Sequence, residues 1–125
     1  MGTLVRDLMR RPVTVGDDAQ MGLVEAQLKM ADVRHVLAVD AAGRLTGVLS
    51  RGDVLRAQAR EGHQFVRDFM TRRLFTLQPD APAVEAIDVM LERGVGAVPI
   101  VDEAGRPVGI LGEVDFLQLA RTTLT

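Results

Sequence analysis

Hydrophobic and polar positions along the chain alternate between the spacing of helices and that of short buried strands. Met21, Val24 and Leu28 recur every three to four residues, as on a helix that buries one face. The short apolar runs at 36–39 and 98–101 are typical of buried strands, and each is followed by a polar turn that ends in glycine. The pattern therefore predicts a mixed α/β fold.

The chain repeats itself. The segment Val-Arg-Asp-Leu-Met at 5–9 recurs as Val-Arg-Asp-Phe-Met at 66–70, and the strand and turn at 39–44 recur at 101–106. Internal repeats of this length indicate two copies of one structural unit. We interpret residues 1–60 as the first copy.

The second copy comprises residues 64–125, and His63 lies in the short connection before it. A unit of about 60 residues buries too little surface to be secure alone. We therefore expect the two copies to share one core, with residues 1–125 forming a single module.

Each copy predicts the same order of elements: a lead-in helix, then strand, helix, strand, strand and helix. The first strands are expected at 13–15 and 75–77. Asp17 or Asp18 is placed to cap the central helix of the first copy, and Asp80 that of the second. Gly94 is placed to end the second of these helices. Its helical spacing is carried by Val84, Ile87, Leu91 and Val95.

Composition narrows the classes of function. A formal net charge of −2 argues against a nucleic-acid or anionic-membrane surface, because either partner requires a basic excess. The absence of cysteine excludes disulfides and thiolate metal sites. The sequence shows no signal peptide and no apolar stretch long enough to span a bilayer. We expect a soluble, cytoplasmic protein without a nucleic-acid or membrane partner.

Ordered segments in both copies resemble the cystathionine-β-synthase-type (CBS) repeat. In the first copy they lie at 33–40 and 43–55, and in the second at 98–102 and 105–115, so the resemblance covers nearly the whole chain. It implies a stand-alone α/β pair of repeats, packed sheet to sheet about a pseudo-twofold axis. It also implies two clefts that commonly hold AMP, ADP, ATP or S-adenosylmethionine, and dimerisation through the helices.

The segment 50–53 is the strongest candidate site in the first copy. It lies where a strand ends and a helix begins, so free N–H groups and the positive end of the helix dipole favour an anion. The Ser50 hydroxyl is suited to a phosphate, and the Asp53 carboxylate is suited to the hydroxyls of a ribose. The resemblance implies these same roles. The alternative is that both residues only cap and solvate the helix.

Other candidate contacts follow from the resemblance. Arg34, His35 and Arg51 add positive charge that can meet phosphates, and Val36 begins the strand beside them. Thr14 and Thr76 begin the first strands, where the family contacts the base or ribose. Solvated arginines, a structural histidine and strand propensity are the alternatives for these residues.

The second copy departs from the pattern. Gly112 stands where the first copy has Ser50, and Glu113 stands in place of Arg51. Asp115 remains. Gly96 and Ala97 replace the Arg-His pair, while Ala97, Val98 and Pro99 could still line an adenine pocket. We expect the first copy to provide the better phosphate site. The second cleft is expected to be empty or to hold a ligand of low negative charge, such as S-adenosylmethionine.

The sequence thus predicts a regulatory sensor that binds an adenosine-type ligand, carries no covalent cofactor and signals to an unknown partner protein, as a homodimer. A ligand-free dimerisation or assembly module is the alternative. An enzyme is disfavoured because no nucleophile–base–orienter set is present. A nucleic-acid role for the arginines of the lead-in segments is a more distant possibility.

Overall fold

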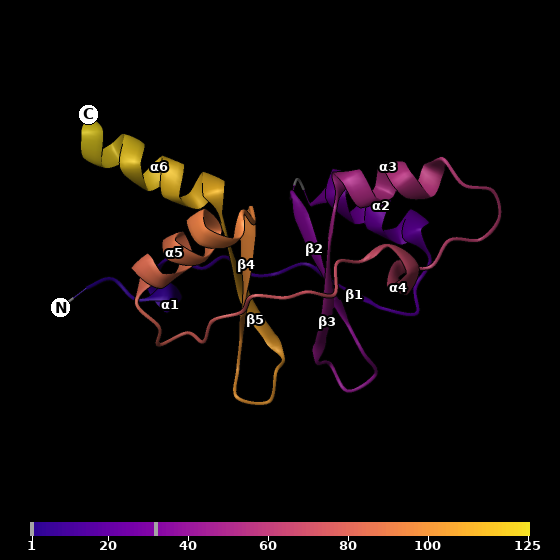
Figure 1. Ribbon diagram of the computed structural model, residues 1–125, viewed down its shortest axis with the longest axis horizontal. Coiled ribbons are helices and arrows are strands. Elements are labelled where there is room, and N and C mark those ends of the chain that lie inside the picture. Colours follow the sequence, from indigo (N-terminus) through magenta and orange to yellow (C-terminus); the bar gives the residue numbers. More distant parts are fainter. Residues whose placement is uncertain (1, 32) are drawn as a thin grey trace. The chain divides into compact units, whose positions relative to one another are not determined.

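The computed structural model, which describes residues 2–31 and 33–125, contains both helices and strands (Figure 1). The mixed α/β fold class is confirmed. In chain order the elements are α1 (Val5–Leu8), β1 (Thr14–Gly16), α2 (Met21–Met30), β2 (His35–Val39), β3 (Leu45–Ser50), α3 (Arg51–Gln58), α4 (Val66–Phe69), α5 (Ala83–Arg93), β4 (Ala97–Val101), β5 (Pro107–Gly112) and α6 (Glu113–Leu124).

The chain forms two compact units that exchange their lead-in helices. The first-copy unit comprises residues 12–74 together with 104–106, and the second-copy unit comprises the remaining segments. Helix α1, which opens the first copy in sequence, therefore lies in the second-copy unit, and α4 lies in the first-copy unit. Each unit has its own buried cluster.

The first-copy unit is built on a three-stranded sheet in the order β1-β2-β3. Strand β1 is parallel to β2, and β2 is antiparallel to β3, with His35 opposite Ser50. Helices α2 and α3 contact each other and the sheet. The core includes Val24, Val36 and Leu49, and α4 completes it with Val66 and Phe69.

The second-copy unit has a two-stranded sheet, β4-β5, with Ala97 opposite Gly112. The strand expected at 75–77 is wrong, because only an isolated bridge between Leu77 and Ile100 forms there. The core comprises Val5, Ala86, Val98, Ile100 and Leu111, so α1 completes this unit as α4 completes the other.

A methionine of each lead-in segment packs against a glycine of the neighbouring strand. A Cβ added to Gly47 would lie 2.5 Å from the sulfur of Met70, and one added to Gly109 would lie 2.5 Å from the sulfur of Met9. Only glycine leaves room for these contacts. The recurrence of both residue types in the two copies thus has a packing cause.

The predicted aspartate caps are wrong. Helix α2 follows Gln20 and α5 follows Pro82, with no side-chain cap at either. Main-chain carbonyls of the lead-in segments take the first helical N–H groups instead. The Met21 N–H donates to the Gln64 carbonyl and the Ala83 N–H to the Thr3 carbonyl, both at 2.8 Å. The predicted helix end at Gly94 is confirmed, with φ of 66°.

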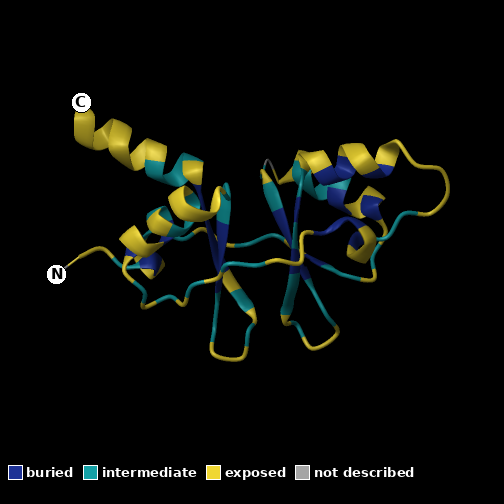
Figure 2. Ribbon diagram, in the orientation of Figure 1, coloured by how far each residue is buried: buried dark blue, intermediate teal, exposed yellow. Residues whose placement is uncertain are grey.

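Helix α5 buries a different stripe from the one that its larger residues predict. Ala83 and Ala86 are buried, whereas Val84 and Leu91 face solvent (Figure 2). The helix packs against α1 and β4, and small side chains permit that close approach. Of the other residues predicted for this stripe, Ile87 is half-buried and Val95 packs against the core.

Candidate functional site

The first-copy unit gathers its predicted site residues at one end of the sheet. His35 and Ser50 are direct cross-strand neighbours, and Thr14 begins the adjacent strand β1, opposite Leu37. Arg34 precedes β2 and Arg51 opens α3, so both guanidinium groups belong to segments at this end. Both arginines are exposed, and neither has an ion-pair partner within residues 2–31 and 33–125.

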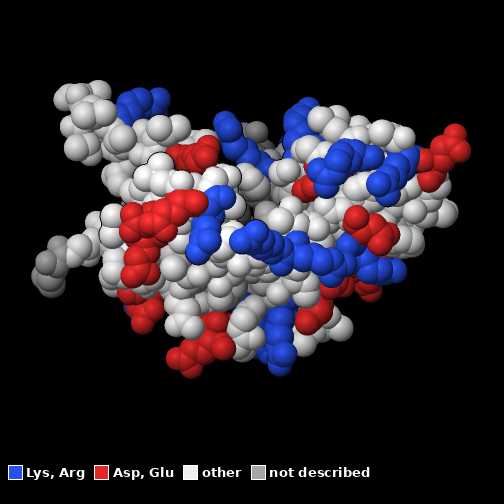
Figure 3. Space-filling model, in the orientation of Figure 1, with Lys and Arg blue, Asp and Glu red and all other residues white. Residues whose placement is uncertain are grey.

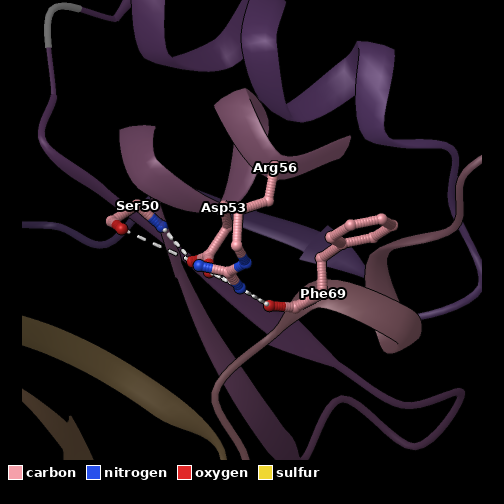
Figure 4. Close-up of polar contacts among 4 residues, drawn as sticks. All are labelled: Ser50, Asp53, Arg56 and Phe69. Carbon is pink, nitrogen blue, oxygen red and sulfur yellow. Dashed lines mark hydrogen bonds and ion pairs between the residues drawn. The ribbon is translucent and has the colours of Figure 1, made fainter. Parts of the chain in front are cut away.

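Asp53 is held tightly at the start of α3 (Figure 4). Its side chain accepts the Ser50 N–H through Oδ2 at 2.8 Å and Nη2 of Arg56 through Oδ1 at 2.6 Å. The same Arg56 nitrogen donates to the Phe69 carbonyl at 3.2 Å. Asp53 is only 4% exposed, so this network fixes the carboxylate against the helix start.

The hydroxyl of Ser50 is the less constrained group. It lies 3.4 Å from Oδ2 of Asp53, which is a long and weak hydrogen bond. Ser50 is the N-cap of α3 as expected, but its hydroxyl does not cap the helix. It can therefore turn to a ligand without breaking a strong bond.

The second-copy unit repeats the aspartate but not its surroundings. Asp115 accepts the Gly112 N–H at 2.7 Å and is ion-paired with Nε of Arg10 at 2.7 Å. The Glu113 N–H donates to the Gly96 carbonyl at 3.1 Å, and the Glu113 carboxylate lies next to Gly96. The start of α6 thus carries two carboxylates and one arginine.

Three of the other predicted residues of this unit lie on β4. The fourth, Thr76, precedes Leu77, which forms the isolated bridge to Ile100 of that strand. Ala97 is half-buried, Val98 and Pro99 are buried, and Thr76 is exposed beside Leu77. The side chain of Val98 belongs to the hydrophobic core, as that of Val36 does in the first-copy unit. A ligand could reach only the main chain of these two valines.

Sequence reasoning missed the two arginines that hold the aspartates. Arg56 follows Asp53 by three residues, so helical spacing could have identified it. Arg10 is 105 residues from Asp115, and no local pattern connects them. The position equivalent to Arg56 is Gln118, and the position equivalent to Arg10 is Thr71. Each unit therefore takes its arginine from a different element.

Within residues 2–31 and 33–125, no helix is long and apolar enough to cross a membrane. Among the same described residues, no three or more acidic or histidine side chains form a cluster that could hold a metal ion.

A hollow of about 230 Å³ lies between α2, α3 and the segment 62–64 of the first-copy unit. None of the predicted site residues lines it, so it is separate from the site at the start of α3.

A family model described as the CBS domain matches residues 5–60 and again residues 66–121. The chain is 29% identical over 119 residues to the L-aspartate semialdehyde sulfurtransferase of Methanocaldococcus jannaschii. It is 26% identical over 122 residues to the A-adding tRNA nucleotidyltransferase of Aquifex aeolicus. These alignments cover 94% and 96% of the chain, but only 23% and 15% of the two relatives.

Solved structures show the same fold. The CBS domain pair of protein MJ0100, in complex with 5′-methylthioadenosine and S-adenosyl-L-methionine, matches with a TM-score of 0.89 and 27% identity over 98% of this chain and 99% of that one. The cytosolic domain of the Mg²⁺ channel MgtE, in complex with ATP, matches with a TM-score of 0.77 and 28% identity over 90% of this chain and 46% of that one.

Proposed function

The chain belongs to the CBS domain family over both of its copies, and on that premise we propose that it is a regulatory module that binds an adenosine-containing ligand and performs no chemistry. The ligand is AMP, ADP, ATP or S-adenosylmethionine. Binding shifts the module between arrangements of different ligand affinity, and a partner protein receives the signal. We also propose that the module acts as a homodimer.

The observation that carries this proposal is the composition of the sheet end in the first-copy unit. Arg34 and Arg51 supply two exposed guanidinium groups, and Ser50 supplies a weakly held hydroxyl beside the N-terminus of α3. Guanidinium groups suit phosphate oxygens. Lone pairs of Asp53 that the protein does not use remain to accept the hydroxyls of a ribose.

The second-copy unit favours a different charge on the ligand. Glu113 and Asp115 outnumber Arg10 at the start of α6, and no hydroxyl replaces Ser50. A sulfonium or an uncharged adenosine meets less repulsion there than a triphosphate does. The MJ0100 domain pair holds two adenosine ligands of this kind, which supports the assignment.

The test is thermal unfolding, followed by circular dichroism, with AMP, ADP, ATP and S-adenosylmethionine in turn. A ligand at 100 times its dissociation constant should add about 2.7 kcal/mol to the free energy of unfolding. The double variant Arg34→Gln/Arg51→Gln should lose most of the shift with ATP, because both exposed guanidinium groups are assigned to the phosphates. Arg44→Gln, in the hairpin turn at the other end of the sheet, is the matched control.

A ligand-free assembly module is the second candidate. It is favoured by the pairing of both Asp53 and Asp115 with arginines of the protein itself. If none of the four ligands raises the unfolding temperature at millimolar concentration, the nucleotide proposal is wrong and this candidate replaces it.

A further inference from the structure

We propose that the arginines around α4 form the surface on which the module binds an acidic segment of its partner protein, a stretch rich in aspartate and glutamate. We call it the arginine surface, and it comprises Arg56, Arg60, Arg67 and Arg72, all exposed side chains of the first-copy unit. The inference names the chemistry of the partner that the proposed function requires, and it rests on that function in this respect. The distribution of charge and the positions of the guanidinium groups support it.

Charge is divided unevenly between the two units. The first-copy unit carries ten lysine and arginine residues and eight carboxylates, a formal charge of +2, whereas the second-copy unit carries five and nine, a formal charge of −4. Within 56–73 there are five arginines and two carboxylates, Glu61 and Asp68. Figure 3 shows Lys and Arg atoms over α3 and in a band that extends to α4. The first-copy unit therefore presents a basic surface although the whole chain is acidic.

Two arginines of this surface lie over aromatic rings. The guanidinium of Arg60 lies 5.3 Å from the ring centre of Phe69, and that of Arg67 lies 5.0 Å from the ring centre of Phe65. Both distances are within the range of a cation–π interaction, which holds a charge in place without neutralising it. The long side chains therefore lose less conformational entropy when a partner binds.

The other two arginines are held by main-chain carbonyls of α4. Arg72 donates from Nη2 to the Arg67 carbonyl at 2.7 Å, and Arg56 donates from Nη2 to the Phe69 carbonyl at 3.2 Å. A carbonyl partner fixes a guanidinium but leaves its charge and most of its five N–H groups for another acceptor. Among the residues that the structure describes, Arg60, Arg67 and Arg72 form no ion pair. The surface is therefore ordered in advance for an anionic partner.

Arg56 also belongs to the predicted ligand site (Figure 4). Its Nη2 donates to Oδ1 of Asp53 at 2.6 Å, and Asp53 is the carboxylate that we assign to the ligand. The arginine surface thus begins next to the predicted site. A partner on this surface would contact an arginine that also holds the carboxylate assigned to the ligand.

A segment rich in carboxylates fits this surface better than a nucleic acid does. A guanidinium binds a carboxylate through two parallel hydrogen bonds. Stacking of bases requires open aromatic faces, but Phe69 is buried and Phe65 carries Arg67 over its ring. A formal charge of +2 is also small for a unit that binds a duplex. An acidic protein segment is therefore the occupant that the surface favours.

The test measures binding of a fluorescein-labelled octaglutamate peptide to the full chain by fluorescence anisotropy, without nucleotide. The double variant Arg60→Gln/Arg67→Gln removes two charges from the arginine surface and leaves the predicted ligand site unchanged. The matched control is Arg93→Gln/Arg121→Gln, which removes two exposed arginines of the second-copy unit, one of which also lies 5.0 Å from a ring centre. Circular dichroism establishes that all three chains are folded.

We expect the unchanged chain to bind octaglutamate, with an affinity that falls as salt is added, because the contacts are between exposed charges. The surface variant should bind roughly tenfold more weakly or worse, since charge-assisted hydrogen bonds are lost, and the control should bind within about twofold of the unchanged chain. No binding at about 1 mM peptide, or equal weakening in both variants, would overturn the proposal.

A nucleic-acid partner is a separate outcome of the same assay. Tighter binding of a labelled DNA duplex than of octaglutamate, lost in the surface variant, would assign the surface to nucleic acid and overturn the acidic protein segment. Since the assay contains no nucleotide ligand, its failure would leave the adenosine proposal standing. That proposal is decided separately by the unfolding test above.

Discussion

Asp53 and Asp115 occupy equivalent positions and accept the same main-chain N–H, three residues earlier, at the start of a helix. Their arginines come from different elements: Arg56 lies on the same helix, while Arg10 comes from the distant lead-in segment. A guanidinium thus reaches the equivalent carboxylate either from the same helix or from the lead-in segment. We therefore expect an arginine at either position to hold the aspartate. The pair in each unit fixes the carboxylate that we assign to the ligand.

This interchange can be tested by moving the arginine. Arg10→Thr, which copies Thr71 of the other unit, removes a half-exposed ion pair and should lower the melting temperature by a few degrees, about 0.5–1 kcal/mol. Adding Gln118→Arg, which copies Arg56, should recover most of the loss, since it places a guanidinium one helical turn after Asp115. Gln118→Arg in the otherwise unchanged chain is the control. No recovery in the double variant would show that the two geometries are not equivalent.

The start of α3 carries a serine hydroxyl that the start of α6 lacks, and this difference leads to a second prediction. A Cβ at Gly112 would meet its nearest neighbour, the Gly96 carbonyl, at 3.6 Å, an ordinary contact. Gly112→Ser should therefore fold normally, with an unfolding temperature near that of the unchanged chain. In isothermal titration it should raise the affinity for AMP by a few-fold, because the new hydroxyl can donate to a phosphate. Unchanged affinity would indicate that the second copy does not bind the phosphate at this position.

At the scale of elements, each short lead-in helix is held by a methionine lying on a strand glycine. Gly47→Ala forces the new methyl group into Met70, and Gly109→Ala forces it into Met9. Overpacking of this kind costs about 1–3 kcal/mol, so each variant should melt several degrees lower. Gly22→Ala is the matched control, because nothing lies within 4 Å of the added methyl group and α2 gains a better helix former. Normal stability of both strand variants would contradict a fixed lead-in helix.

The elements also show which parts of the secondary structure could be predicted from sequence patterns. Strands with uninterrupted apolar runs, such as 36–39, and the helix end at Gly94 follow from local chemistry and were predicted correctly. The stripe of α5 was not predicted correctly, since the helix buries Ala83 and Ala86 where it packs against α1 and β4, while the larger Val84 and Leu91 face solvent. The helix starts depend on carbonyls 43 or 80 residues away along the chain, at Gln64 and Thr3, which no window of sequence contains.

The same limit applies to the candidate site. The positions of His35 and Ser50 at one sheet end follow from pairing two predicted strands, and Asp53 follows by helical spacing. The ion pair between Arg10 and Asp115 could not be predicted, because it depends on which unit receives the first lead-in segment. Sequence repeats are assigned by order along the chain, whereas packing assigns each lead-in helix to the other unit.

For the whole molecule, this exchange means that the sequence repeat and the folding unit differ. A boundary at residue 60 separates the first-copy sheet from α4 and the residue after it, which supply the buried Val66, Phe69 and Met70. It keeps α1, whose packing partners lie in the second-copy unit. Because each lead-in helix belongs to the core of the unit built from the opposite copy, a change in that helix alters the stability of the opposite copy.

Two fragments of similar length test this directly. Fragment 12–74 contains the first-copy unit except for residues 104–106, while fragment 1–60 contains the first sequence copy. Both fragments contain β1, α2, β2, β3 and the whole of α3. Burial of one large apolar side chain contributes about 1.5–3 kcal/mol. Loss of three such side chains approaches the entire stability of a small domain, about 5–15 kcal/mol. Thermal scans by circular dichroism should therefore show a cooperative transition for 12–74 and none for 1–60. A fragment 1–60 that melts as cooperatively as 12–74 would mean that the lead-in helices do not determine which segments fold together.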